Sequence, residues 1–206
     1  MPIYVYAYIN SRMTKIGRPR SFDKTAVLTA AMNAFWAGGY AGTTYADLEK
    51  ATGLRRQSLT YAFGEKPSLF KYALGLYIDL RVKKASELLT RDAPLRSNLQ
   101  ELLDAWEADA VSGQGRGCLL VRATAELEND PQISVELRRG DNLLMRALTD
   151  AFLRASASCE ISLTVDAAAL ARLVISTGNG AMIQSVARRD SSVSRAAHDA
   201  LMQLIK

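Results

Sequence analysis

The spacing of apolar residues from position 22 onward constrains the fold more than any other feature of this sequence. Apolar side chains recur there at intervals of three and four residues, which is the period of an amphipathic α-helix. Glycine, proline and capping residues separate the helical stretches. We therefore predict an all-α protein of about nine helices, at residues 22–38, 45–51, 55–62, 67–90, 95–111, 117–128, 131–156, 165–188 and 190–206.

Residues 1–16 do not follow this pattern. Apolar residues alternate there with Tyr4, Tyr6 and Tyr8, as in a β-strand, but no other segment reads as a strand that could pair with it. A lone strand is not stable in water. We expect a disordered extension over 1–16 and hypothesise that translation begins at Met13. N-terminal mass analysis of the native protein tests this, because an intact Met1 or Pro2 terminus contradicts it.

Positive charge is concentrated in the first third of the chain. Residues 1–66 carry nine Lys and Arg against four Asp and Glu, whereas the remainder carries 17 of each. The net charge of +5 therefore lies entirely in residues 1–66. This distribution is typical of a segment that binds a polyanion, joined to a part with another role. A merely solubilising surface would spread the excess over the chain.

The reactive residue types argue against an enzyme or a metal protein. Cys118 and Cys159 lack the spacing of a disulfide framework or a zinc site, and His198 is the single histidine. A helical-bundle enzyme with a metal centre needs paired Glu-x-x-His elements, and a Ser-His or Cys-His nucleophile would have to use His198. We expect His198 at the surface or an interface, no metal and no cofactor. No apolar run approaches the roughly 20 residues that span a membrane, and a reducing cytoplasm is the expected location.

Residues 44–63 have the layout of a helix-turn-helix. A short helix at 47–51 is followed by Gly53, which tolerates the positive φ of a sharp turn, and by a second helix. Leu54, Leu59 and Phe63 are expected to face inward. The outer face then carries Arg55, Arg56, Gln57, Ser58, Thr60 and Tyr61, of which Arg and Gln can pair with base edges. An ordinary helical hairpin with a solvated face is the alternative.

The stretch GRPRSFDKTAVLTAAMNAFWAGGYAGTTYADLEKATGLRRQSLTYAFGEKPSLFKYAL, about residues 17–75, resembles the DNA-binding domain of the TetR family of transcriptional regulators. The matching features are a basic GRPR lead, FWAGGY at a helix end, TT before the supporting helix, G-L before the recognition helix, SL…F within it, then G-E-K and LF. The segment GCLLVRATAEL at 117–127 is similar, more weakly, to a ligand-domain helix of part of that family.

The resemblance implies roles for particular residues. Thr44 and Tyr45 contact phosphate, and Lys66 grips phosphate at the start of the fourth helix, helped by the helix dipole. Ser58 supports a backbone contact, and Arg18 and Arg20 track the flanking backbone or enter a minor groove. The residues in or beside the major groove are Arg55, Arg56, Gln57, Thr60 and Tyr61. Two positions depart from the family: Thr60 replaces a common Tyr, and Glu49 replaces a small residue, so that Glu49 points to solvent or the two helices pack differently.

The resemblance also implies a domain at 17–66 that binds DNA and a helical domain at 67–206 that binds an effector and dimerises. A homodimer would form through the last two helices, at Leu170, Leu173, Val174, Thr177, Ala197, Leu201 and Leu204; a core within one chain is the alternative for this apolar stripe. Candidate effector contacts are Trp106, Cys118, Val121, Arg122, Asn142, Met145, Asn179 and Met182. For Arg122 the alternative is a pair with Glu126, and for Trp106 and Met145 it is the core. Gly178 and Gly180 within one helix suggest a close helix contact or a kink.

We expect a repressor that binds palindromic double-stranded DNA as a homodimer and is released by a small molecule. Control by a protein partner without a small-molecule effector is the alternative, and a helical-bundle enzyme is a more distant one.

Overall fold

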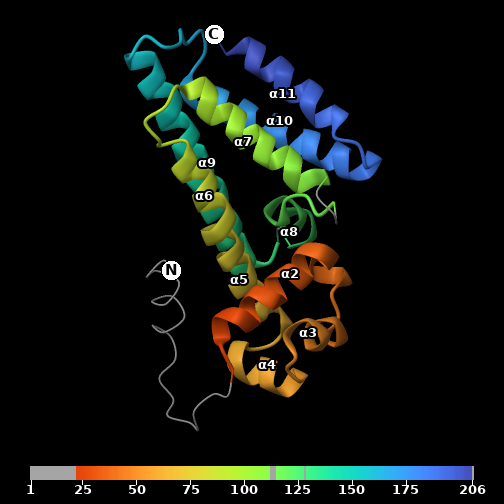
Figure 1. Cartoon of the computed structure of the whole chain (residues 1–206). Coiled ribbons are helices and arrows are strands. Elements are labelled where there is room, and N and C mark those ends of the chain that lie inside the picture. The colour runs from red at the N-terminus through yellow and green to blue at the C-terminus, as the bar shows by residue number, and fades with distance from the viewer. Residues whose placement is uncertain (1–21, 112–114, 128, 206) are drawn as a thin grey trace. The chain divides into compact units, whose positions relative to one another are not determined.

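The computed structural model describes residues 22–111, 115–127 and 129–205, and within these ranges every regular element is a helix (Figure 1). The chain divides into two compact units, 1–79 and 80–206. Unit 1 contains α2 (Lys24–Gly42), α3 (Tyr45–Thr52), α4 (Arg56–Phe63) and α5 (Lys66–Tyr77). The π-helical segment η1 (Ile78–Val82) crosses the boundary, and unit 2 continues with α6 (Lys83–Leu88), α7 (Leu95–Val111), α8 (Leu119–Leu127), α9 (Pro131–Ala157), α10 (Ala167–Arg188) and α11 (Ser192–Leu204).

The all-α prediction is confirmed. Because α5, η1 and α6 follow one another without a break, they correspond to the single helix expected at 67–90, and the described chain then has nine helices. The expected domain boundary after residue 66 differs from the division after residue 79, since α5 packs against α2 within unit 1. The expected extension at 1–16 lies outside the described residues.

Unit 1 is held together by aromatic packing between α2 and α5. Phe35 and Phe70, both fully buried, meet edge to face with ring centroids 4.9 Å apart, a favourable geometry for aromatic pairs. The regular part of α2 stops at Gly39, where φ is 74°. The Thr43 hydroxyl donates to the Gly39 carbonyl at 2.6 Å and fixes this break. The expected end of the first helix at residues 38 and 39 is therefore seen in the backbone.

The core of unit 2 lies among α7, α9, α10 and α11. Phe152 of α9, Leu103 of α7 and Val174 of α10 are fully buried in it, and Leu201 of α11 joins them. The short α6 lies beside α9 (Figure 1). None of the helices in the described ranges is both long enough and apolar enough to span a bilayer.

The histidine of α11 corrects a sequence-based expectation. His198 was expected at a surface or an interface, but it is buried, with 3% of its area exposed. Neither ring nitrogen has a hydrogen-bond partner in the described chain. Burial lowers the pKa of His198, while the carboxylates of Glu107 and Asp104 on α7 and of Asp199 oppose that shift.

The two glycines of the 178–180 segment differ in their surroundings. An added Cβ at Gly178 would lie 2.2 Å from Cζ3 of Trp106, whereas at Gly180 it would meet nothing within 4 Å. Gly178 therefore permits the close approach of the α7 indole to α10, which is one of the two expected explanations.

Candidate nucleic-acid interface

The supporting helix of the motif, α3, begins at a complete capping box. The Thr44 hydroxyl accepts from the Asp47 N–H at 3.2 Å, and the Asp47 carboxylate accepts from the Thr44 N–H at 2.9 Å. The Thr44 hydroxyl also donates to Asp47 at 2.6 Å, and these bonds to Thr44 lower the pKa of the Asp47 carboxyl. The side chain of Thr44, which we expect to contact phosphate, is exposed, and its bonds to Asp47 hold it in place.

The turn between α3 and α4 depends on Gly53. Its φ of 70° lies in the left-handed region, where a side chain is strained, and its N–H donates to the Glu49 carbonyl at 2.8 Å. Leu59 and Phe63 of α4 are buried as expected, whereas Leu54 is half-buried.

Glu49 does not simply point to solvent. Its Oε1 accepts from the Arg56 N–H at 2.6 Å, and its Oε2 lies 3.8 Å from Nη1 of Arg55. The larger side chain at this position therefore bridges the two helices of the motif at the start of α4. The sequence showed the departure from the family but not the acceptor role, because only the fold brings residue 49 to residue 56.

A second carboxylate holds the other arginine of α4. The Arg56 guanidinium stacks on the Tyr45 ring at 4.1 Å and lies 3.6 Å from the Glu65 carboxylate. The Tyr45 hydroxyl donates to Glu65 at 2.8 Å and accepts from the Lys66 N–H at 2.9 Å. Sequence reasoning missed Glu65, whose proximity depends on the return of the chain from α4 to α5.

The ammonium group of Lys66 has an aromatic neighbour. Its Nζ lies 4.5 Å from the centroid of the Tyr40 ring, which is a cation–π contact. Lys66 thus stands at the start of α5 beside Tyr45, and its phosphate contact stays a prediction. Arg18 and Arg20, the other expected backbone contacts, lie outside the described residues.

The outer face of α4 exposes most of the residues that we expect to contact base edges. The side chain of Arg55 is 89% exposed and Tyr61 is 75% exposed, and Gln57 and Ser58 are also exposed. Thr60 differs from the expectation, because it is half-buried and its hydroxyl oxygen is inaccessible and unpartnered within the described chain. In this conformation the hydroxyl of Thr60 faces the protein, while Tyr61 supplies the exposed aromatic ring.

The residues expected at a dimer interface fall into three groups by burial. Val174 and Leu201 belong to the core of unit 2, so the intramolecular alternative describes these two. Leu173 and Leu204 are exposed, and half-buried positions are Leu170, Thr177 and Ala197.

The residues expected to bind an effector are mostly half-buried. Met182 is buried, Asn142 is exposed, and the half-buried ones are Trp106, Cys118, Val121, Arg122, Met145 and Asn179. Trp106 and Met145 pack against the core cluster, and Arg122 lies 3.7 Å from Glu126. These placements agree with the alternatives given above, which are core packing for Trp106 and Met145 and an ion pair with Glu126 for Arg122.

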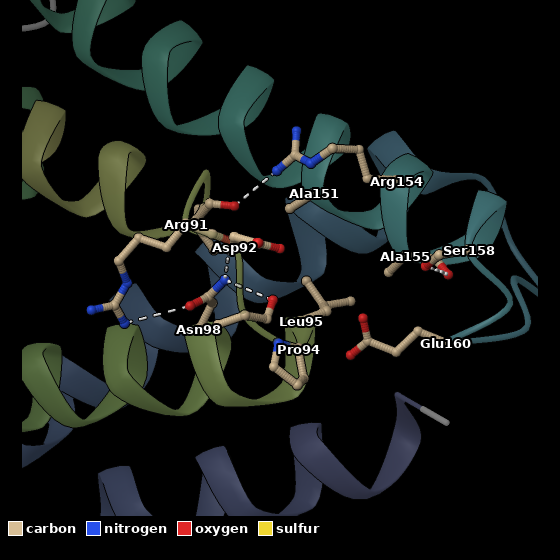
Figure 2. Close-up of a pocket in the computed structure, with 12 residues that line it drawn as sticks. Arg91, Asp92, Pro94, Leu95, Asn98, Ala151, Arg154, Ala155, Ser158 and Glu160 are labelled. Atoms are coloured by element: carbon tan, nitrogen blue, oxygen red, sulfur yellow. Dashed lines mark hydrogen bonds between the residues drawn. The ribbon is translucent and has the colours of Figure 1, made fainter.

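A cavity of about 540 Å³ lies elsewhere in unit 2, between the α6–α7 connection and the end of α9 (Figure 2). Leu95 and Ala151 contribute to its apolar wall, and Glu160 extends toward Leu95 (Figure 2). The Arg154 guanidinium closes one side by donating to the Leu89 carbonyl at 2.8 Å. None of the eight expected effector residues lines this cavity. In the sequence, Pro94 of this lining indicates only the start of a helix.

Comparison with known proteins gives matches over both units. The profile of the family described as bacterial regulatory proteins, tetR family, matches residues 27–73. The tetracyclin repressor-like C-terminal domain profile matches residues 97–201, which is more than half of the chain.

Two curated relatives are regulators. The HTH-type transcriptional repressor ComR of Escherichia coli (strain K12) is 33% identical over 117 residues, which are 55% of each chain. The match thus spans about half the length of ComR. The HTH-type transcriptional regulator YezE of Bacillus subtilis (strain 168), described as uncharacterized, is 28% identical over 76% of this chain and 82% of its own.

Among solved structures, a cysteine mutant of the TetR family regulator CifR, in complex with a 26-bp operator duplex, superposes with a TM-score of 0.80. It is 27% identical over 92% of this chain and 100% of its own. A regulator from Agrobacterium tumefaciens, at 24% identity, has a TM-score of 0.80 over 88% of this chain and 96% of its own, and so matches in fold.

Proposed function

This chain belongs to the TetR family of DNA-binding transcriptional regulators, and we propose that it is a repressor that binds a palindromic operator as a homodimer and is released by a small molecule. The observation that carries the DNA-binding part is the edge of α4, where exposed Arg55, Gln57 and Tyr61 stand beside an Arg56 held over Tyr45. Arg and Gln read guanine and adenine edges in the major groove. The operator complex of the similar CifR protein supports the same mode of binding.

Phosphate contacts are assigned to the residues that flank this edge. Thr44 and Tyr45 stand at the start of α3, and Lys66 stands at the start of α5. Phosphate contacts fix the register of a protein on the duplex, whereas base contacts choose the sequence. Substitutions in the two groups of residues should therefore have different effects on DNA affinity and on sequence selectivity.

In vitro selection of duplexes from a random library tests this assignment. The wild-type chain should select a palindrome and release it steeply as salt rises. Gln57→Ala should relax the selected sequence, at a cost of about 1–3 kcal/mol for one base pair. Lys66→Ala should weaken all duplexes alike and reduce the salt slope by about 1 for each protomer, which is about 2 for the dimer. A wild-type chain that enriches no sequence at any salt concentration contradicts the proposal.

The dimer is proposed to form through the exposed faces of α10 and α11. On α10 an apolar and small-residue stripe is exposed in the single chain, running through Leu173, Ser176 and Ile183. On α11, Ala196, Ala200 and Leu204 are exposed at intervals of four residues. Small residues allow two helices to approach closely, and two linked half-sites multiply a weak single-site affinity.

The effector is proposed to enter unit 2, and the cavity beside α6 supports this, because its volume lies within the usual range of about 300–1,000 Å³ for ligand pockets. Glu160→Trp places a large side chain at the exposed edge of the cavity, and Arg122→Ala changes the site expected from the sequence. A compound that releases the operator from the wild-type chain should lose its effect in one of these variants. If the compound still releases the operator from both variants, the effector binds elsewhere. If no compound releases the operator, control by a protein partner is favoured.

A further inference from the structure

The recognition helix α4 begins without a capping side chain of its own. Arg55 occupies the N-cap position and makes no side-chain capping bond. A guanidinium group only donates hydrogen bonds, so it cannot accept from the free N–H groups of the first helical turn. Good N-cap residues such as Ser, Thr, Asp and Asn all carry an acceptor.

Glu49 of the preceding helix supplies the missing acceptor. Its Oε1 accepts from the Arg56 N–H, which is the first N–H of α4, at 2.6 Å. Its own carbonyl accepts from the Gly53 N–H at 2.8 Å. One residue is thus bonded to both sides of the turn, and a carboxylate at a helix N-terminus is also favoured by the helix dipole.

The same carboxylate lies beside Arg55 without enclosing it. Glu49 Oε2 is 3.8 Å from Nη1 of Arg55, whose side chain remains 89% exposed. Ion pairs that are this exposed are weak. Arg55 therefore stays available to DNA while the capping role lies with another residue.

We infer that Glu49 is a positioning residue for sequence-selective DNA binding. It caps α4 from α3, and this leaves the N-cap position to an arginine that can reach the duplex. The inference rests on the proposed function for the DNA contact of Arg55, but the capping itself does not. A bystander acid on this face would only repel DNA, equally at all sequences.

The substitutions Glu49→Ala and Glu49→Gln separate the two effects. Both remove the negative charge, but glutamine keeps an oxygen that can accept from the Arg56 N–H. The probes are the duplex that the wild-type chain selects and poly(dI-dC). Both variants should bind poly(dI-dC) as tightly as the wild type or somewhat more tightly, because one negative charge is gone. Glu49→Ala should bind the selected duplex about 5-fold more weakly than Glu49→Gln. Equal affinities of the two variants for that duplex overturn the inference.

A second measurement uses no DNA. Amide hydrogen exchange at the Arg56 N–H should be faster in Glu49→Ala than in Glu49→Gln, and equal rates overturn the capping role. Adding Arg55→Ser places an acceptor at the N-cap, so Glu49→Ala should then lower the unfolding midpoint less than it does alone. If the wild-type chain selects no duplex, the proposed function and the DNA-binding part of the inference both fail, and the exchange rates still decide the cap.

Discussion

Gly178 and Gly180 are two residues apart on α10, but only Gly178 is in close contact with another helix. Trp106 of α7 lies against Gly178, so that a methyl group there would be 2.2 Å from Cζ3 and 2.3 Å from Cε3 of the indole. The indole belongs to the layer packed against the core of unit 2 and cannot move away freely.

Alanine at these two positions should therefore have opposite effects on stability. Gly178→Ala should lower the free energy of unfolding by about 1–3 kcal/mol, the usual cost of overpacking a core. Gly180→Ala is the matched control, and it should raise that free energy by up to about 1 kcal/mol, because alanine favours a helix interior. Urea unfolding at one fixed protein concentration measures both. A change of the same sign and size in the two variants contradicts this account of Trp106.

Helix α11 contains a buried histidine, His198, whose side chain can bind a proton. The carboxylates that act on His198 are those of Glu107 and Asp104 on α7 and of the neighbouring Asp199, and Arg195 on α11 donates to Glu107 at 2.7 Å. Burial keeps the pKa of His198 below its ordinary value of 6.5. The unfolded chain therefore binds a proton at His198 at a higher pH than the folded chain does.

The stability of the fold should fall as the pH is lowered through 6.5. Above that pH the imidazole is neutral in both states and contributes no pH dependence. Below it the free energy of unfolding should decrease by at most about 1.4 kcal/mol per pH unit, the limit for one proton. Urea unfolding at pH 7.5, 6.5 and 5.5 measures the change, and His198→Leu should remove it, since the chain has one histidine. A fall of equal size in the variant would show that another group is responsible.

On the scale of the whole molecule, α10 and α11 leave apolar area uncovered in a single chain. Ile183 of α10 is 54% exposed, and Val135 of α9 is 52% exposed, but only Ile183 lies on the face that we propose for the dimer. The two residues have similar size and exposure, which makes them a matched pair for substitution.

Ile183→Arg should convert the dimer to monomers and lower affinity for the selected duplex at least about 10-fold, because two buried arginines would face each other across the symmetric interface. Val135→Arg should change neither property. Sedimentation velocity gives the oligomeric state, and fluorescence anisotropy gives the affinity. A dimer that persists in Ile183→Arg excludes this face.

The sequence by itself determined the helices and the position of the DNA-binding motif. Periodicity and capping are local, so the segments at 45–51, 55–62, 95–111 and 131–156 lie within a residue or two of α3, α4, α7 and α9. Gly53 could be assigned to the turn because a left-handed backbone there favours glycine whatever the rest of the fold does.

Only the tertiary structure decided which side chains meet. Glu49 reaches Arg56 and Glu65 reaches Tyr45 because turns bring separate helices together, and no helical period encodes those distances. His198 is buried and Thr60 turns inward for the same reason: the apolar stripe of a helix identifies a face, but its neighbours decide what covers that face. The cavity beside α6 arises where one connection lies against the end of α9, and that juxtaposition exists only in the folded chain.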